Sequence, residues 1–276
     1  MVYHANFENK MKSSQKGALF AAPLIYFCAG RGYNRKKPPL RRTEGDDMKI
    51  AGLQKTTLLD YPGKVACTVF LAGCNFRCPY CQNAEIAFAP GGEDIAEEEL
   101  FSLLQKRRGI LDGVCVTGGE PLLGDIAPLL GRIKQLGYAV KLDTNGSFPD
   151  KLEALCKAGL VDFVAMDIKN APQKYALTAG VPVDMGAVRA SAAFLLGGGC
   201  ACELRTTVVR GLHTEEDMEA IGQWLAGAER YFLQNFRDSD AVPTAGLAPC
   251  SEEELRAMLL RLQTYIPAAR IRGEGE

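Results

Sequence analysis

The stretch Cys74-Asn75-Phe76-Arg77-Cys78-Pro79-Tyr80-Cys81 carries three thiols within eight residues, spaced C-x3-C-x2-C. This spacing is short enough for one loop to direct all three sulfurs at a single metal centre. A structural zinc site closes with four protein ligands, whereas an iron–sulfur cube held by three thiolates leaves one iron free. The spacing leaves three interpretations open: a catalytic cluster, a zinc site with a distant fourth ligand, and a set of buried unreactive thiols.

The same stretch resembles the signature of radical S-adenosylmethionine (SAM) enzymes, including the aromatic Tyr80 before the third cysteine. The resemblance implies that Cys74, Cys78 and Cys81 are the catalytic ligands of a [4Fe-4S] cluster whose free iron binds the amino and carboxylate groups of SAM. An electron from the cluster would then cleave the sulfonium to methionine and a 5′-deoxyadenosyl radical. It also implies that Tyr80 packs on adenine, with a plain core aromatic as the alternative, and that Asn83 belongs to the SAM site.

The composition is that of a soluble globular protein, with 47% hydrophobic and 24% charged residues. A chain of 276 residues can bury a sizeable core in one domain. The net charge is −1, but residues 1–47 carry nine Lys and Arg against four Asp and Glu, and the remainder carries 23 against 29. A mildly acidic body gives no reason to expect nucleic-acid binding.

Residues 1–47 differ in character from the rest of the chain. An apolar run, 18–29, precedes a basic, proline-containing run, 35–42, and this order mimics a secretory signal peptide. The apolar run is too short to span a membrane, and export conflicts with a cluster that needs a low-potential electron donor. We therefore expect an N-terminal extension with little fixed structure over 1–47, with Met48 as an alternative start, and a radical SAM domain over 48–276.

Seven further cysteines are scattered along the chain, mostly inside apolar runs, as buried free thiols often are. The pattern does not resemble a secreted disulfide framework, so it favours a reducing cytoplasm. Cys200-x-Cys202 is the only other close pair. It falls in a strand-like run with both side chains on one face, which indicates packing.

Short apolar runs alternate with helical patterns from residue 65 onward. Strands are predicted at 65–70, 113–117, 138–142, 163–168, 203–209 and 231–234. Helices are predicted from an Asp94 cap, near 126–136, over 149–158, near 185–196, from a Thr214 cap, and from a Ser251 cap. This alternation implies an α/β fold of parallel βα units. The order fits an open doubly wound sheet as well as a barrel, and the resemblance favours the partial (β/α)6 TIM-like barrel of radical SAM enzymes.

Polar motifs come directly after three of the predicted strands, at the ends where parallel α/β folds bind ligands. They are Gly118-Gly119-Glu120, Asp143-Thr144-Asn145-Gly146 and Asp167-Ile168-Lys169. The resemblance implies that Gly118 and Gly119 bind the SAM amino group through their carbonyls, supported by Glu120. It places Asp143, Thr144 and Asp167 beside SAM, where they can hold a monovalent cation, and Lys169 at the SAM carboxylate or ribose. The alternative is that Asn145-Gly146 is a turn and Lys169 a surface cation.

Two arginines are weaker candidates for the SAM site. Arg205 lies in a strand whose arginine points at SAM in the family, and Arg237 occupies a place where some relatives use a histidine. A structural salt bridge is an equal alternative for either side chain. Neither His4 nor His213 has a sequence neighbour that suggests catalysis.

The stretch Leu58-Leu59-Asp60-Tyr61-Pro62-Gly63-Lys64 and the motifs above resemble glycyl-radical-enzyme activating enzymes, most of all the activating protein of anaerobic ribonucleoside-triphosphate reductase. This resemblance implies a glycyl radical enzyme as protein substrate and an electron donor of the flavodoxin or ferredoxin type, with no nucleic-acid or membrane partner. The alternatives are an activator of another glycyl radical enzyme, such as pyruvate formate-lyase, a radical SAM enzyme acting on a small molecule, and a non-catalytic metal-binding or electron-carrying protein.

Overall fold

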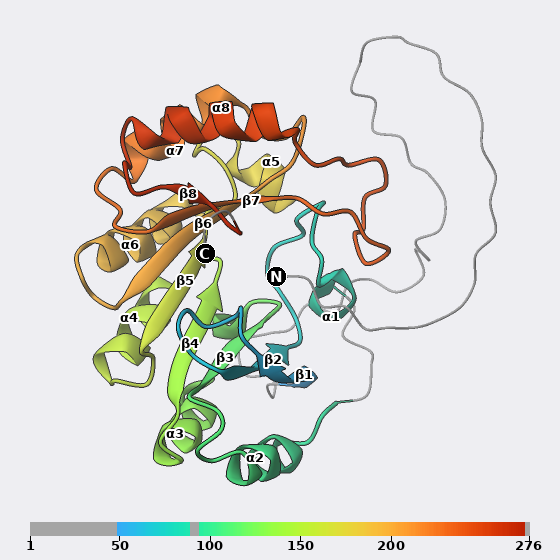
Figure 1. Ribbon diagram of the computed structural model, residues 1–276, viewed down its shortest axis with the longest axis vertical. Coiled ribbons are helices and arrows are strands. Elements are labelled where there is room, and N and C mark those ends of the chain that lie inside the picture. Colours follow the sequence, from blue (N-terminus) through green and yellow to red (C-terminus); the bar gives the residue numbers. More distant parts are fainter. Residues whose placement is uncertain (1–48, 89–93, 274–276) are drawn as a thin grey trace, which may run out of the picture.

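The protein is described by a computed structural model over residues 49–88 and 94–273 (Figure 1). The extension expected at 1–47 lies outside these residues. Within the two described ranges, no helix combines the length and the apolar character needed to cross a membrane.

The described strands form one eight-stranded sheet in the order β1-β2-β3-β4-β5-β6-β7-β8. They are β1 (Ile50–Thr57), β2 (Ala66–Leu71), β3 (Gly113–Gly118), β4 (Ala139–Thr144), β5 (Phe163–Asp167), β6 (Cys202–Val208), β7 (Tyr231–Asn235) and β8 (Arg270–Ile271). β1 pairs antiparallel with β2, and all later neighbours are parallel. Because the strand order never reverses, the sheet lacks the switch point of a doubly wound fold. This topology confirms the partial barrel.

A helix lies in each parallel crossover and covers the outer side of the curved sheet (Figure 1). This one-sided cover results from right-handed crossovers between sequential strands. The crossover helices are α2 (Glu97–Lys106), α3 (Ala127–Gln135), α4 (Pro149–Lys157), α6 (Met185–Leu196), α7 (Glu215–Trp224) and α8 (Glu252–Gln263). Two short helices, α1 (Ala84–Phe88) and α5 (Tyr175–Ala179), come after β2 and β5. Neither short helix is predicted from the sequence, and β1 and β8 are likewise missed.

Two of the three predicted helix caps are confirmed. Thr214 and Ser251 each form a capping box with the third residue of the adjoining helix. The Asp94 cap is wrong: α2 begins at Glu97 with Ala96 in the N-cap position, and the Asp94 carboxylate instead pairs with Lys49. The long-range ion pair to the residue before β1 therefore replaces the local cap.

Strand alternation gives the barrel an apolar outer face and a polar interior. In β4, Val140 and Leu142 are fully buried in the hydrophobic core, while Lys141 and Asp143 lie on the opposite face and form an ion pair with each other. The Lys141 side chain is only 2% exposed. Buried charges require partners. The charged side chains inside the barrel therefore form a network of ion pairs, which extends to the carboxyl ends of the strands.

Candidate active site

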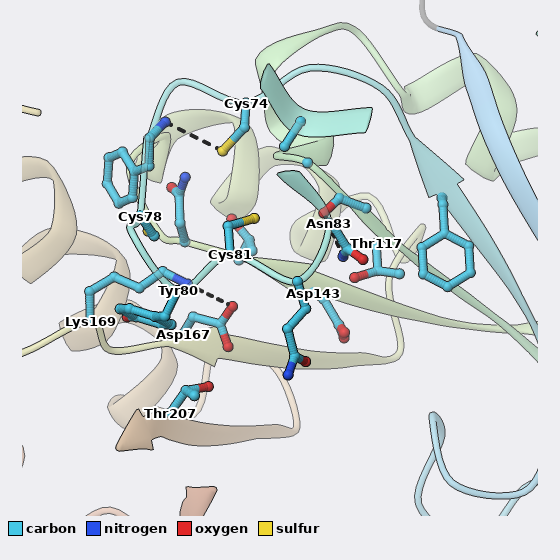
Figure 2. A pocket seen from close by; sticks show the side chains of 18 of the residues that line it. Cys74, Cys78, Tyr80, Cys81, Asn83, Thr117, Asp143, Asp167, Lys169 and Thr207 are labelled. Carbon is cyan, nitrogen blue, oxygen red and sulfur yellow. Dashed lines mark hydrogen bonds and ion pairs between the residues drawn. The ribbon is translucent and has the colours of Figure 1, made fainter. Parts of the chain in front are cut away.

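A cavity lies at the carboxyl ends of the parallel strands, where the loops after β2, β3, β4 and β5 meet (Figure 2). Two of the predicted site residues, Glu120 and Arg237, do not belong to its lining. The predicted residues that do line it are Cys74, Cys78, Tyr80, Cys81, Asn83, Gly118, Gly119, Asp143, Thr144, Asp167, Lys169 and Arg205. Four separate sequence motifs therefore converge on one cavity.

The cysteine loop is held by its own backbone and by one arginine. The backbone N–H of Phe76 donates to the Sγ of Cys74 at 3.3 Å (Figure 2). Cys81 N donates to the Cys78 carbonyl at 3.2 Å. The guanidinium of Arg77 donates to the carbonyl oxygens of Cys74 and Phe76, at 2.5 and 2.7 Å. These bonds fix the loop so that its cysteines face the cavity.

The three thiols of the loop face the same cavity. All three line the cavity, yet no group of three or more His, Cys, Asp or Glu side chains in the described ranges is gathered tightly enough to ligate a single metal ion. Burial raises the pKa of each thiol, to about 11 for Cys81, so metal binding would have to release protons. For Cys78, the ammonium of Lys169 opposes this rise in pKa but does not cancel it.

The hydroxyl of Tyr80 is buried without a protein partner in the described ranges. Tyr80 is 5% exposed and lines the cavity, and its buried hydroxyl oxygen has no hydrogen-bond partner within the described chain. An unpaired buried hydroxyl costs about 1–3 kcal/mol. A bound polar molecule beside the cysteine loop would satisfy it, which agrees with the SAM contact that the resemblance implies for this ring.

The glycine pair packs directly against the start of the cysteine loop. Gly119 N donates to the Leu71 carbonyl at 2.8 Å, and Glu120 N donates to the Gly73 carbonyl at 2.8 Å. Gly118 has a φ of +113°, and the Asn83 side chain donates to its carbonyl at 3.1 Å. The resemblance implies that the carbonyls of Gly118 and Gly119 bind SAM. The carbonyl oxygen of Gly118 already accepts the hydrogen bond from Asn83.

Replacing Gly119 by Ala is expected to disrupt the site, because the added Cβ would lie 1.9 Å from the Gly73 carbonyl oxygen. The backbone of Gly73 and Cys74, at the start of the cysteine loop, would have to move. We expect at least a tenfold loss of SAM affinity and a loss of about 1–3 kcal/mol in the free energy of unfolding. The matched control is Gly131→Ala in α3, where the Cβ meets nothing within 4 Å and Ala favours the helix by about 1 kcal/mol. Equal SAM affinity in both variants, measured by equilibrium dialysis, would contradict this account.

Glu120 supports the site from behind and does not face the cavity. Its carboxylate accepts hydrogen bonds from Leu122 N at 3.0 Å, from the Thr144 hydroxyl at 2.8 Å and from Asn145 N at 2.7 Å. Burial raises its pKa to about 7, although these three bonds oppose the shift. Glu120 therefore ties the glycine loop to the Thr144–Asn145 turn, and it is a positioning residue.

The cysteine loop is joined to the same turn by side-chain amides. Asn145 Nδ2 donates to Asn75 Oδ1 at 2.8 Å, and Asn75 Nδ2 donates to the Ser147 hydroxyl at 2.9 Å. The turn that the sequence allowed for at Asn145-Gly146 thus exists, with Gly146 at a φ of +75°, and it also supports the cavity.

The carboxylates of Asp143 and Asp167 are bridged by Arg205. Arg205 donates to Asp143 at 3.1 Å and to Asp167 at 2.5 Å, and Asp143 also pairs with Lys141. Lys169 pairs with Asp167 at 3.1 Å (Figure 2). Lys169 is therefore not a surface cation. Arg205 forms structural salt bridges, which the sequence analysis gave as the alternative to a contact with SAM.

These ion pairs hold both carboxylates in the charged form. Burial alone would raise the pKa of Asp143, but Arg205 and Lys141 outweigh it and lower the pKa. For Asp167, burial is likewise outweighed by Arg205 and Lys169, and its pKa falls well below the ordinary range. The cavity wall thus presents fixed charges of both signs, as a zwitterionic ligand with a sulfonium requires.

Arg237 lies away from these groups. Its side chain is exposed, and its backbone carbonyl accepts a hydrogen bond from the Gln82 side chain at 2.8 Å. The contact joins the end of β7 to the residue after the third cysteine. The part of Arg237 that meets the loop is therefore its backbone, and its guanidinium does not line the cavity.

His213 supports the site, although no sequence motif surrounds it. It is 2% exposed, its Nδ1 accepts from Val209 N at 3.1 Å, and its Nε2 therefore carries the proton and donates to the Lys169 carbonyl at 2.9 Å. Its ring also forms a T-shaped pair with the ring of Tyr80, with the centroids 6.3 Å apart. Burial lowers the pKa of His213, so the neutral form is favoured. Asp60 and Cys115 are further lining residues that the motifs did not indicate.

Replacing His213 by Phe is expected to weaken SAM binding by several-fold and to lower the free energy of unfolding by about 2 kcal/mol, because two buried backbone groups lose their partner. The cluster content should stay unchanged, since His213 does not contact the cysteines. His213→Gln keeps a donor for the Lys169 carbonyl and should recover part of the affinity. A His213→Phe protein that binds SAM as tightly as the parent, in titrations at equal iron content, would show that the histidine is only structural.

Comparison with known proteins agrees with this geometry. A family model described as the radical SAM superfamily matches residues 68–225. A Methanocaldococcus jannaschii protein named "putative glycyl-radical enzyme activating enzyme" is 30% identical over 231 residues, which cover 81% of this chain and 95% of that protein. The pyruvate formate-lyase-activating enzyme of Clostridium pasteurianum is 32% identical over 128 residues, covering 44% of this chain and 52% of that enzyme.

Among solved structures, Streptococcus suis SuiB bound to S-adenosylmethionine has a TM-score of 0.58 at 15% identity, covering 72% of this chain and 48% of SuiB. At this identity the likeness concerns the fold alone. The family match includes the cysteine loop and the loops that end β3, β4 and β5. The chain therefore belongs to the radical SAM superfamily of enzymes, a membership that implies SAM and a [4Fe-4S] cluster as its cofactors.

Proposed function

We propose that this radical SAM enzyme activates a glycyl radical enzyme, and that the partner is anaerobic ribonucleoside-triphosphate reductase. The observation that carries the general activity is the similarity to the Methanocaldococcus jannaschii protein named as a putative glycyl-radical enzyme activating enzyme. The similarity extends over 95% of the length of that protein. The choice of partner rests on the stretch from Leu58 to Lys64 together with the strand-end motifs. An activator of pyruvate formate-lyase or of another glycyl radical enzyme is the nearest alternative.

The site residues have distinct proposed roles. Bound at the site, the cluster and SAM would supply a reducing electron and a carbon-centred radical that removes a hydrogen atom. Cys74, Cys78 and Cys81 would hold the cluster. Lys169, fixed by Asp167 at 3.1 Å, would meet the SAM carboxylate or ribose, and Tyr80 would pack on the adenine.

The glycine carbonyls and the acidic motifs complete the proposed SAM site. Gly118 and Gly119 would face the SAM amino group, with Asn83 fixing the position of Gly118 through its 3.1 Å hydrogen bond. Asp143 and Thr144 would contribute to the polar wall. A monovalent cation at Asp143 and Asp167 would compete with Arg205, which already forms ion pairs with both carboxylates, so we propose that Arg205 takes the place of the cation. Activity that requires added potassium or sodium ions would contradict this assignment.

The cavity continues past the SAM residues to a polar floor. Asp60, Thr68 and Cys115 line it, and the Thr68 hydroxyl donates to Asp60. Carboxylate and hydroxyl oxygens there can accept hydrogen bonds from the backbone N–H groups of an inserted peptide loop. We further propose a cytoplasmic location and a flavodoxin- or ferredoxin-type electron donor.

The test is anaerobic activation of candidate partners. The reduced, cluster-loaded enzyme is mixed with SAM and with the reductase, and the glycyl radical is followed as a doublet by electron paramagnetic resonance. We expect a doublet with the reductase and none when its radical-bearing glycine is replaced by alanine. A doublet with pyruvate formate-lyase alone would move the assignment to that partner. Release of 5′-deoxyadenosine with no doublet for any glycyl radical protein would instead favour a small-molecule substrate.

A further inference from the structure

A second pocket lies near the amino ends of the strands, whereas the SAM cavity lies at their carboxyl ends. Its volume is about 640 Å³, within the range of about 300–1,000 Å³ that is typical of small-molecule sites. The loop between β1 and β2, the starts of β4 to β7 and the residue after β8 contribute its lining. Within the described chain, the two pockets share no lining residue. The second pocket is therefore a separate candidate site, which the radical chemistry does not use.

Two carboxylates line this pocket, and both already have cationic partners. Asp162 accepts hydrogen bonds from the Lys134 ammonium at 2.7 and 2.8 Å. Glu203, whose side chain is 3% exposed, accepts a hydrogen bond from the Arg272 guanidinium at 2.6 Å. Because each carboxylate is already paired, the pocket gives no reason to expect a cationic ligand.

Two cations of the pocket have aromatic rings as their partners. The Lys64 ammonium lies 5.7 Å from the ring centroid of Tyr61, and the Arg230 guanidinium lies 5.8 Å from that of Phe163. The two rings are neighbours, with their centroids 6.2 Å apart. Within residues 49–88 and 94–273, the side chains of Lys64 and Arg230 form no ion pair and no hydrogen bond. Both charges are therefore available to an anion bound in the pocket.

A third cation, Arg272, adds a flat surface to the same pocket. Its guanidinium lies over the ring of Phe232, 3.7 Å from the centroid, and its side chain is 25% exposed. The hydrogen bond to the buried Glu203 holds the guanidinium in this position. Guanidinium planes stack on aromatic rings, so the face of Arg272 that is turned away from Phe232 can stack on a planar ring of a ligand.

We propose that this second pocket binds a nucleoside phosphate. The phosphate groups meet Lys64 and Arg230, because charge-assisted hydrogen bonds from ammonium and guanidinium groups suit phosphate oxygens. The base stacks on the guanidinium of Arg272. Binding is reversible and changes no covalent bond. The pocket is separate from the SAM cavity, so this inference does not depend on which protein receives the glycyl radical.

The experiment is isothermal titration calorimetry of the cluster-loaded, oxidised protein with ATP, in the presence of saturating SAM. SAM occupies the first cavity and is not cleaved without a reducing electron, so ATP reports only on the second pocket. We expect one ATP bound per chain, with an affinity that falls as the salt concentration rises. Tripolyphosphate lacks the base and should bind at least tenfold more weakly than ATP.

Matched variants locate the bound ATP. Arg230→Met and Lys64→Met should each raise the dissociation constant for ATP at least tenfold. The control is Arg189→Met, because Arg189 is exposed like Arg230 and its guanidinium also lies over a ring, 5.2 Å from the centroid of Trp224, outside the pocket. This variant should bind ATP as the wild-type protein does.

Four results would overturn the proposal. The first two are an absence of ATP binding to the wild-type protein, and equal ATP affinity in the wild-type protein and Arg230→Met. Tripolyphosphate that binds as tightly as ATP would show that the pocket does not recognise the base. The acidic C-terminal residues 274–276 follow Arg272 closely in the sequence, and ATP binding that appears only after their removal would make them the occupant.

Discussion

Replacing Cys78 by Ala is expected to abolish cluster binding and SAM cleavage. The Cys78 side chain is buried against the cavity, close enough to the ammonium of Lys169 for that charge to act on its thiol, and the proposal already uses Cys74 and Cys81 as ligands. Loss of a residue that only supports a metal ligand lowers the metal affinity or the activity about 10–100-fold. Loss of a ligand itself should lower them further. Iron content, and 5′-deoxyadenosine released under reducing conditions, measure the effect.

The control for this variant is Cys156→Ser, a half-buried cysteine outside the cavity. It should keep the iron content and the cleavage rate of the wild-type enzyme. Cleavage by Cys78→Ala at more than a tenth of the wild-type rate would mean that the cluster is held by other residues. The corresponding variants of Cys74 and Cys81 should behave as Cys78→Ala does, because a cube held at three corners loses its open-iron geometry when any one ligand is lost.

Replacing Arg205 by Met is expected to destabilise the fold by about 3–5 kcal/mol, because it leaves the buried carboxylate of Asp143 and the partly buried carboxylate of Asp167 without their shared partner. Lys141 and Lys169 remain, but each contacts only one of the two carboxylates. The control is Arg237→Met, whose side chain is exposed, and which should change the free energy of unfolding by less than about 0.5 kcal/mol. The free energies of unfolding of the two variants and the wild-type protein are compared by urea denaturation at pH 7.

The loss in Arg205→Met should depend on pH. In the wild-type protein the pKa values of Asp143 and Asp167 are lowered on folding, so their stabilisation is present above the unfolded pKa of about 4 and is lost as the pH falls through the folded values. Without Arg205 the folded pKa values rise, and the variant gains relative stability when the carboxylates become protonated. The difference between the two proteins should therefore shrink from pH 7 towards pH 4. A difference that is constant over this range would show that Arg205 acts through packing alone.

The sequence predicted most of the sheet, because the strands from β2 to β7 are short apolar runs separated by helical patterns. It missed β1, whose residues Gln54, Lys55 and Thr56 are exposed at the edge of the sheet. Edge strands carry little of the hydrophobic pattern on which such predictions depend. The predicted cap at Asp94 is wrong because the competing partner, Lys49, is distant in the sequence.

The lining of the candidate site could be predicted where a motif comes directly after a strand, since parallel strands bring their carboxyl ends together. The orientation of single side chains could not. Glu120 turns away from the cavity because its carboxylate binds backbone and hydroxyl groups of the next loop, and His213 reaches Lys169 across the fold. Neither contact has a local sequence pattern.

The most direct test of the central claim is the metal content and the spectrum of the anaerobically reconstituted wild-type protein, with and without SAM. A cluster held by three thiolates at an open site predicts about four iron and four sulfide ions per chain. It also predicts an electron paramagnetic resonance signal of the reduced cluster that changes when SAM is added. A single zinc ion per chain, or an iron signal that SAM leaves unchanged, would contradict the account.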